Sequence, residues 1–235
     1  EGPHPAGLPG THIHFVDPVS PNKTVWFIGY QDVIAIGHLF LHGTVLSERV
    51  VALGGPGVSS PRLIKTCLGA NLEELTAGEL EAGEQRVVSG SVLAGHTAQG
   101  HRAYLGRYHN QVSVLAEHRE RKLLGYLAPG SSVHSVFPAF LSKWIGEKSV
   151  SFTTTTNGSE RGMVPIGTYD DVIPMDILAT PLMKSILVGD VEKSIELGCL
   201  EVDEEGIARC TYACPGKYEF GPVLREMLTQ IEKEG

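Results

Sequence analysis

The chain is short of cysteine, of basic residues and of long apolar runs, and each shortage excludes a class of protein. Four cysteines in 235 residues are too few and too clustered for the disulfide framework of a secreted domain, so we expect a reducing compartment. Lysine and arginine total 19 against 27 aspartate and glutamate, a net charge of −8. A duplex-binding surface needs a strong basic excess, so nucleic acid is not expected as a partner.

The longest uncharged run, Leu123 to Ser142, contains two prolines, two glycines, four serines and a histidine. It is neither apolar nor helical enough to cross a bilayer, so no transmembrane segment is predicted. The chain begins without methionine or a signal peptide, and we expect its start to be a cut inside a longer protein. A composition of 42% hydrophobic and 20% charged residues is ordinary for folded domains.

The first fifty residues follow a strand, helix, strand order. Short strands are predicted at His12–Val16 and Thr24–Ile28 from their β-branched and aromatic residues. The apolar spacing of Gln31–Leu41 predicts a helix that ends at Gly43, and Arg49–Leu53 is predicted to be a buried strand. This order suggests the end of an α/β layer.

Residues 61–105 predict a small α+β unit. Strands are expected at Arg62–Cys67 and Arg86–Leu93. Between them Asn71 is a suitable N-cap for a short helix whose Leu72 and Leu75 face inward.

Residues 107–127 predict a β-hairpin with strands Gln111–Leu115 and Leu123–Leu127 around a charged tip. A two-stranded hairpin is marginal alone, so we expect it to pair with a sheet outside this chain. From residue 137 onward the pattern is mostly helical, clearest at Pro222–Lys233, where apolar residues recur at i, i+3, i+4 and i+7.

A C-x3-C-P segment begins at Cys210 and resembles the end of a bacterial iron–sulfur segment. The two preceding ligand positions hold Glu204 and Ile207, which supply no thiolate, although Cys199 lies upstream. Two interpretations stay open: Cys199, Cys210 and Cys214 bind a metal, or they pack as small apolar side chains, which we favour.

Two further motifs are weaker. His12 and His14 would share one face of a strand, a workable metal pair that lacks an adjacent third ligand. The Gly54–Gly57 turn (GGPG) follows an apolar strand, but it lacks phosphate-loop spacing and its proline removes a donor. We therefore expect no catalytic, cofactor-binding or metal residue in this chain.

An aromatic stripe at helical spacing consists of Phe137, Phe140, Leu141 and Trp144. Such a stripe is usually core. If exposed, Phe137, Phe140 and Trp144 would suit contact with a partner or a membrane surface.

Several long strings together resemble the A subunit of the bacterial sodium-translocating NADH:quinone reductases. They cover essentially the whole chain and are residues 5–14 (PAGLPGTHIH), 28–37 (IGYQDVIAIG), 68–76 (LGANLEELT), 153–161 (TTTTNGSER), 214–222 (CPGKYEFGP) and 231–235 (IEKEG).

The resemblance implies that this chain is the C-terminal half of a longer protein. The implied fold is α+β and multi-domain. Residues 1–54 would finish a Rossmann-like domain, 58–106 would form a soluble-ligand-binding β-grasp domain, and 137–235 a mostly helical domain. The hairpin at 107–127 would pair with the N-terminal half.

The resemblance also implies a function. The chain would be a peripheral subunit on the cytoplasmic face of the bacterial inner membrane, docked on the membrane-embedded B subunit and contributing to ubiquinone binding. NADH, flavins and iron–sulfur centres would belong to other subunits of the Na⁺ pump, leaving this chain without its own redox cofactor. The alternative is a free-standing metal- or ligand-binding redox module that uses Cys199, Cys210 and Cys214.

Overall fold

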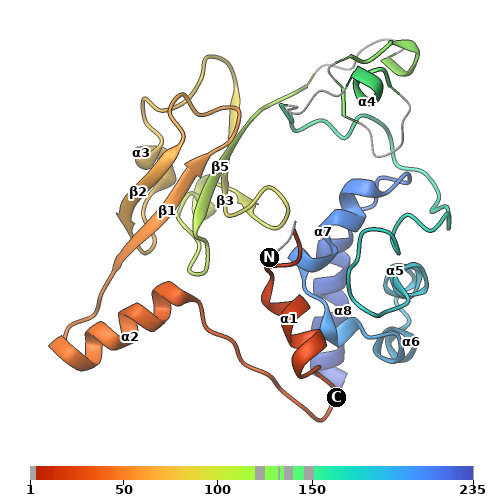
Figure 1. Ribbon diagram of the computed structural model, residues 1–235, viewed down its shortest axis with the longest axis horizontal. Coiled ribbons are helices and arrows are strands. Elements are labelled where there is room, and N and C mark those ends of the chain that lie inside the picture. Colours follow the sequence, from red (N-terminus) through yellow and green to blue (C-terminus); the bar gives the residue numbers. More distant parts are fainter. Residues whose placement is uncertain (1–3, 120–124, 132, 135–139, 146–150, 235) are drawn as a thin grey trace. The chain divides into compact units, whose positions relative to one another are not determined.

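The computed structural model describes residues 4–119, 125–131, 133–134, 140–145 and 151–234, and it combines one β-sheet with several helices (Figure 1). This confirms a mixed α+β architecture. The chain divides into two compact units, Gly29–Asn157 and a second unit formed by Glu1–Ile28 with Gly158–Gly235. The predicted segment 1–54 is therefore shared between the two units.

The first unit, here called the sheet unit, is built on five strands in the order β2-β1-β5-β3-β4. Its elements are α2 (Tyr30–His42), β1 (Glu48–Gly54), β2 (Arg62–Cys67), α3 (Leu72–Leu75), β3 (Gln85–Ser89), β4 (His96–Thr97), η1 (Gly100–Arg102), β5 (Gln111–Ala116), η2 (Gly125–Leu127) and α4 (Ser142–Ile145).

Strand β5 is central, which corrects the prediction of a hairpin over 107–127. β5 pairs in parallel with β1, where Ala52 lies opposite Gln111, and antiparallel with β3. Both edges of β5 are thus used within the chain, and Gly125–Leu127 forms a 3₁₀ turn instead of a second strand. The alternation at 111–115 identifies a strand but carries no information about its partner, which comes from a distant part of the sequence.

The sheet core lies on the face that carries Val51, Leu53, Val112 and Val114. Leu72 from α3 packs against this face and is fully buried. The alternating burial along β1 follows from the two-residue period of a strand. The predicted N-cap is confirmed, since Asn71 Oδ1 accepts a hydrogen bond from the Glu73 amide at 2.9 Å.

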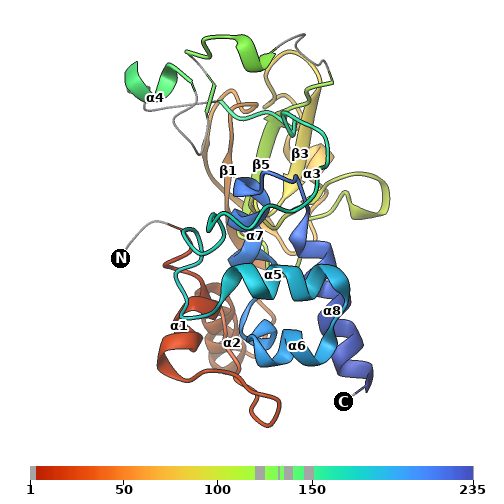
Figure 2. The same ribbon diagram turned by 90° about the vertical axis from the view of Figure 1, so that its right-hand side faces the viewer.

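The second unit, here called the helical unit, contains α1 (Pro9–Val16), α5 (Ala179–Val188), α6 (Val191–Glu196), η3 (Cys199–Glu201), α7 (Glu204–Ala213) and α8 (Phe220–Glu234). Figure 2 shows α5 and α6 lying alongside α8. The inward face of α8 carries Phe220, Leu224 and Met227, whose burial at i, i+4 and i+7 matches the predicted helical period.

The strands predicted at His12–Val16 and Thr24–Ile28 are wrong. The first segment is helical in α1, with Pro9 at its start, and the second is irregular. Proline suits the first turn of a helix, and the side chains of α1 find partners in the helical unit. These tertiary contacts outweigh the weak β propensity of the sequence HIHFV.

Candidate functional site

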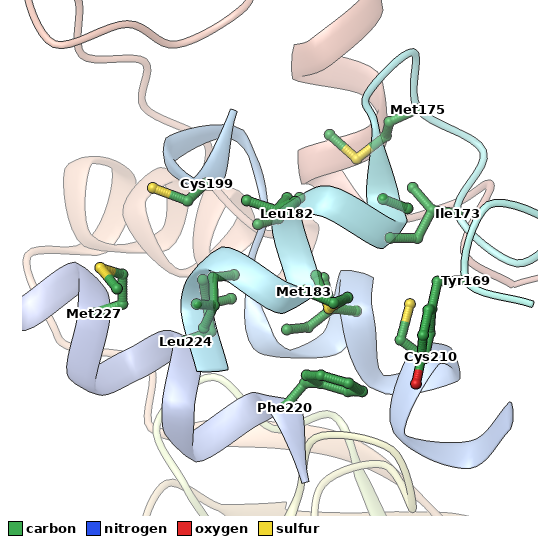
Figure 3. Packing of buried hydrophobic residues seen from close by; sticks show 14 of the residues in the cluster. Tyr169, Ile173, Met175, Leu182, Met183, Cys199, Cys210, Phe220, Leu224 and Met227 are labelled. Carbon is green, nitrogen blue, oxygen red and sulfur yellow. The ribbon is translucent and has the colours of Figure 1, made fainter. Parts of the chain in front are cut away.

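The three candidate metal cysteines are part of the core of the helical unit. Figure 3 shows two of them, Cys199 and Cys210, among the other core side chains. Cys199, Cys210 and Cys214 are buried and free of disulfides. Burial raises the pKa of the Cys199 thiol to about 11 and that of Cys210 to about 12. A metal ligand must be a thiolate, and these surroundings favour the protonated thiol.

Contacts of these thiols also favour packing. The Tyr169 hydroxyl lies 3.1 Å from Cys214 Sγ, and burial is the main cause that raises the pKa of this tyrosine. Among the residues that the structure describes, no three histidine, cysteine, aspartate or glutamate side chains gather closely enough to hold a metal ion. The geometry gives no support to a redox module built on Cys199, Cys210 and Cys214.

Two residues stand where an iron–sulfur segment would have cysteine, and both have structural roles. Ile207 is fully buried in the core of the helical unit. Glu204, in the first turn of α7, accepts two hydrogen bonds from Arg225 on α8, at 2.5 and 2.8 Å. This pairing is the main cause that lowers the pKa of Glu204.

His12 and His14 do not point at a common ligand. His12 Nε2 contacts the Ala6 carbonyl at 2.8 Å. His14 Nε2 accepts a hydrogen bond from the Asp176 amide at 3.0 Å, so its Nδ1 donates to Glu201, 2.8 Å away. His14 therefore fixes α1 within the helical unit.

The glycine turn after β1 is a packing device. Gly55 has φ +114°, and a Cβ there would collide with the backbone of Val114. A Cβ at Gly57 would collide with the Gln85 side chain. Glycine is required because the turn lies directly against β5, and this explains the motif without a phosphate.

A serine–histidine pair lies in the sheet unit, and no sequence motif indicates it. Ser89 Oγ lies 2.8 Å from His109 Nδ1 and accepts a hydrogen bond from the Gly106 amide. The pair has the spacing of a nucleophile and its base, but Ser89 is fully buried, so a substrate cannot reach it. The pair joins β3 to the loop before β5.

The feature that is unusual for a folded protein is α2. This 13-residue helix has no buried residue, although most of its side chains are apolar. Phe40 is 85% exposed and Leu41 80%, and Val33, Ile34, Ile36 and Leu39 are also exposed. Helices that are apolar on most sides are normally enclosed by other protein.

Polar contacts attach the first turn of α2 to the sheet. Gln31 accepts a hydrogen bond from the Val50 amide at 2.9 Å and donates to the Val50 carbonyl at 2.8 Å, as a neighbouring strand would. Asp32 forms ion pairs with Arg49 and with Arg107, the latter at 2.9 Å. No local sequence pattern indicates these pairs, because the partners are 17 to 75 residues apart.

The three predicted partner-contact residues have different outcomes. Phe137 lies outside the described residues. Phe140 packs against Gly130, close to where a Cβ would be. Trp144 is 80% exposed, so it is not a core residue of the described part of the chain.

No helix within the described ranges is both long and apolar enough to span a membrane.

Comparison with known proteins shows which proteins the chain resembles. Residues 1–45 match the family model described as the NqrA second alpha/beta domain, and residues 50–100 match the one described as the NQRA C-terminal domain. The chain is 60% identical over 234 residues to the A subunit of the Na(+)-translocating NADH-quinone reductase of Saccharophagus degradans, and equally to that of Cellvibrio japonicus. The corresponding protein of Klebsiella pneumoniae is 59% identical over 234 residues.

These alignments cover 100% of this chain and 52% of each relative, so the chain spans about half the length of the curated relatives it matches. The resemblance found in the sequence is confirmed: over its whole length the chain is similar to the C-terminal half of the A subunits of Na(+)-translocating NADH-quinone reductases.

Proposed function

We propose that this chain is part of a peripheral subunit of a respiratory Na⁺-pumping NADH:ubiquinone oxidoreductase, on the cytoplasmic face of the bacterial inner membrane. The observation that carries this is the 60% identity over the whole chain to relatives of that name. Its partners are the other subunits of the complex, chiefly the membrane-embedded B subunit, and ubiquinone. NADH, flavins and iron–sulfur centres act in other subunits, and the buried thiols described above agree with a chain that holds no redox cofactor.

The sheet unit supports the proposal of a β-grasp domain. Hairpin β1–β2, short helix α3 and a later strand β5 parallel to β1 at the sheet centre follow the β-grasp order. The predicted span of 58–106 then extends to include β1 and β5. We infer that residues 1–45, which the structure divides between its two units, join a Rossmann-like domain that is completed by sequence present in the longer relatives.

Helix α2 is the contact that joins this chain to that remaining sequence. Its Gln31 and Asp32 are committed to the sheet, whereas its apolar side chains from Val33 onward have no cover among the described residues. Burial of a Phe or Leu side chain is worth about 1.5–3 kcal/mol, so covering α2 yields a strong association. Covering α2 therefore completes the fold of the longer subunit, and we infer that only the completed subunit docks on the complex and helps to shape its quinone site.

A groove in the sheet unit is a candidate position for part of that quinone site. It has a volume of about 300 Å³ and lies between α3 and β3, with Thr76, Leu80, Val87 and Ala98 among its walls. Apolar walls of this kind suit a quinone ring. Labelling of the assembled complex with a photoreactive ubiquinone should mark residues of this groove.

The assembly proposal is tested in the full-length protein within the complex. Phe40→Asp should abolish its co-purification with the membrane subunits and the NADH-driven reduction of quinone. The matched control is Val92→Asp, because Val92 is also an exposed apolar residue of the sheet unit but lies outside α2. Normal assembly of the Phe40→Asp complex would refute the proposed role of α2.

A further inference from the structure

A long segment leaves the sheet unit after β5 and returns to the same place. We call residues 118–153 the excursion. Thr153 forms a parallel bridge with Ala116, and the Thr154 amide donates to the Ala116 carbonyl at 3.3 Å. The His118 amide donates to Thr154 Oγ1, which donates in turn to Glu117, at 3.0 and 2.9 Å. The two ends of the excursion are thus closed by hydrogen bonds.

Ion pairs strengthen this closure. Glu117 accepts two hydrogen bonds from Arg86 on β3, at 2.7 and 2.8 Å. Arg119 makes a similar fork with Glu84, at 2.5 and 2.9 Å. Loops with closed ends on a rigid support often carry function.

The described part of the excursion is folded against itself. The Leu141 amide donates to the Pro129 carbonyl at 2.9 Å, and the Ser142 hydroxyl donates to the Val133 carbonyl at 2.5 Å. Gly130 has φ +63°, and the Phe140 ring lies where a Cβ of residue 130 would collide with it. The segment from Pro129 to Val133 therefore supports the start of α4.

This support presents apolar side chains to solvent. Trp144 is 80% exposed and Ile145 67%, and Leu127 and Leu141 are also exposed. We call these four residues the tip surface. They are too few for a stable protein interface, which buries about 800 Å² on each partner.

The chemistry of the excursion is that of a segment lying at a membrane surface. Its sequence holds five basic and two acidic residues in a chain whose net charge is −8. Of the two basic residues that the structure describes there, Arg119 is paired with Glu84, and Lys143 is exposed beside Trp144. It also contains five of the sixteen aromatic residues, counted over seven Tyr, seven Phe and two Trp. Tryptophan beside lysine, as in Lys143–Trp144, is typical of the bilayer interface, and basic residues are attracted to anionic headgroups.

We propose that the tip surface contacts the headgroup layer of an anionic lipid bilayer, with Trp144 and Ile145 inserted and Lys143 at the phosphates. This rests on the proposed function, which brings the chain next to a membrane complex. A single apolar contact of this size gives weak and reversible binding. It therefore orients the chain on the membrane and adds to docking on the complex.

The chain contains two tryptophans, one inside and one outside the excursion, which makes the test selective. Trp26 is 89% exposed and belongs to the other unit. In the variant Trp26→Phe the tryptophan fluorescence comes from Trp144 alone, and in Trp144→Phe it comes from Trp26 alone. Each is mixed with vesicles of equal parts phosphatidylglycerol and phosphatidylcholine, or of phosphatidylcholine alone, and its fluorescence and quenching by acrylamide are measured.

With the anionic vesicles, Trp144 emission should shift to the blue and its quenching constant should fall at least about twofold, whereas Trp26 should not change. Lys143→Gln should weaken vesicle binding about fivefold, and Trp144→Ala about tenfold. Val188→Ser, which removes an exposed apolar side chain of the helical unit, should bind like the parent. Circular dichroism checks that each variant is folded.

Three outcomes overturn the proposal. In the first, the fluorescence of neither tryptophan changes with vesicles, and in the second, both change equally. In the third, the fluorescence of Trp144 changes with the purified membrane subunits in detergent but not with vesicles. The last outcome would identify a protein partner instead. Because the vesicles contain no other protein, a negative result leaves the assembly proposal for α2 untouched, and failure of assembly leaves the vesicle result untouched.

Discussion

Asp32 holds two arginines at the point where α2 meets the sheet, and the substitution Asp32→Asn tests how much this contact stabilises the unit. The side chain of Arg49 is 5% exposed and that of Asp32 is 21% exposed. The change keeps the shape of Asp32 but leaves the Arg49 charge buried without its carboxylate. Breaking a buried pair in this way costs about 3–5 kcal/mol, and partial access of water to Asp32 reduces our expectation to about 2–4 kcal/mol.

The assay is urea unfolding at neutral pH. Arg49→Leu should cost less, because Asp32 keeps Arg107, and the double variant should cost less than the sum of the two. Glu48→Gln is the matched control, because Glu48 lies on β1 next to Arg49. It breaks the exposed pair with Lys65 at 3.1 Å and should change stability by less than about 1 kcal/mol. An Asp32→Asn loss no larger than this control would refute the reasoning.

The same pair has a defined pH dependence. The hydrogen bond from Arg107 is the main cause that lowers the pKa of Asp32, and Arg49 lowers it further. A carboxyl whose pKa is lowered in the folded state stabilises the fold fully when the pH is above its ordinary pKa of about 3.9. This contribution is lost as the pH falls through the lowered pKa. The stability difference between parent and Asp32→Asn should therefore be constant near neutral pH and shrink below about pH 4. A difference that shrinks between about pH 6 and 8, where His titrates, would contradict the assignment to Asp32.

Two further predictions concern the cores. Only Cys67 is exposed, and burial raises the pKa values of the Cys199 and Cys210 thiols. A thiol reagent should therefore modify one of the four cysteines in the native chain and all four after denaturation. Rapid labelling of more than one cysteine in the native chain would show that the helical unit opens. Leu72→Ala should lower the free energy of unfolding of the sheet unit by about 2–5 kcal/mol, and Leu75→Ala should lower it by less, because Leu75 is only partly buried. If both variants and the parent are equally stable in urea, α3 does not pack on the sheet as described.

Local signals in the sequence predict the elements well where the signal is backbone chemistry. Gly43 ends α2 in a left-handed conformation at φ 69°, and Asn71 caps α3, both as the sequence indicates. Strand β2 has the predicted bounds Arg62–Cys67. Glycine's freedom at positive φ and the reach of an asparagine side chain depend on a few adjacent residues, so these features are legible without the rest of the fold.

Partners distant in sequence are where the predictions failed. Residues 12–16 are helical because His14 finds Glu201 and the Asp176 amide, 187 and 162 residues away. Asp176 stands three residues before α5, which begins at Ala179, and its side chain does not cap the helix. The amide of Thr180 in its first turn bonds to Asp170 instead. An N-cap residue and a nearby aspartate look alike in sequence, and only the path of the loop decides between them.

The candidate sites also show that a local pattern does not identify its distant surroundings. The C-x3-C-P segment suggests chemistry, and its thiols turn out to be core, because small sulfur side chains fill the space between α7 and its neighbours as well as any apolar group. The spacing of Gln31–Leu41 predicts a helix, and the helix forms, but its apolar side chains are exposed. A periodic pattern predicts that a face will be covered, and it does not say whether the cover belongs to the same chain.

Exposure of apolar residues therefore carries more functional information here than any polar cluster does. The apolar face of α2 is wide, and its first turn is held by an ion-paired aspartate, as expected of a surface that is covered permanently. The tip surface of the excursion is small and lies beside a lysine, as expected of a contact that forms and releases. The two surfaces thus differ in the number of exposed apolar side chains and in neighbouring charge, and these differences match the two proposals, in which α2 is covered by protein and the tip surface contacts lipid.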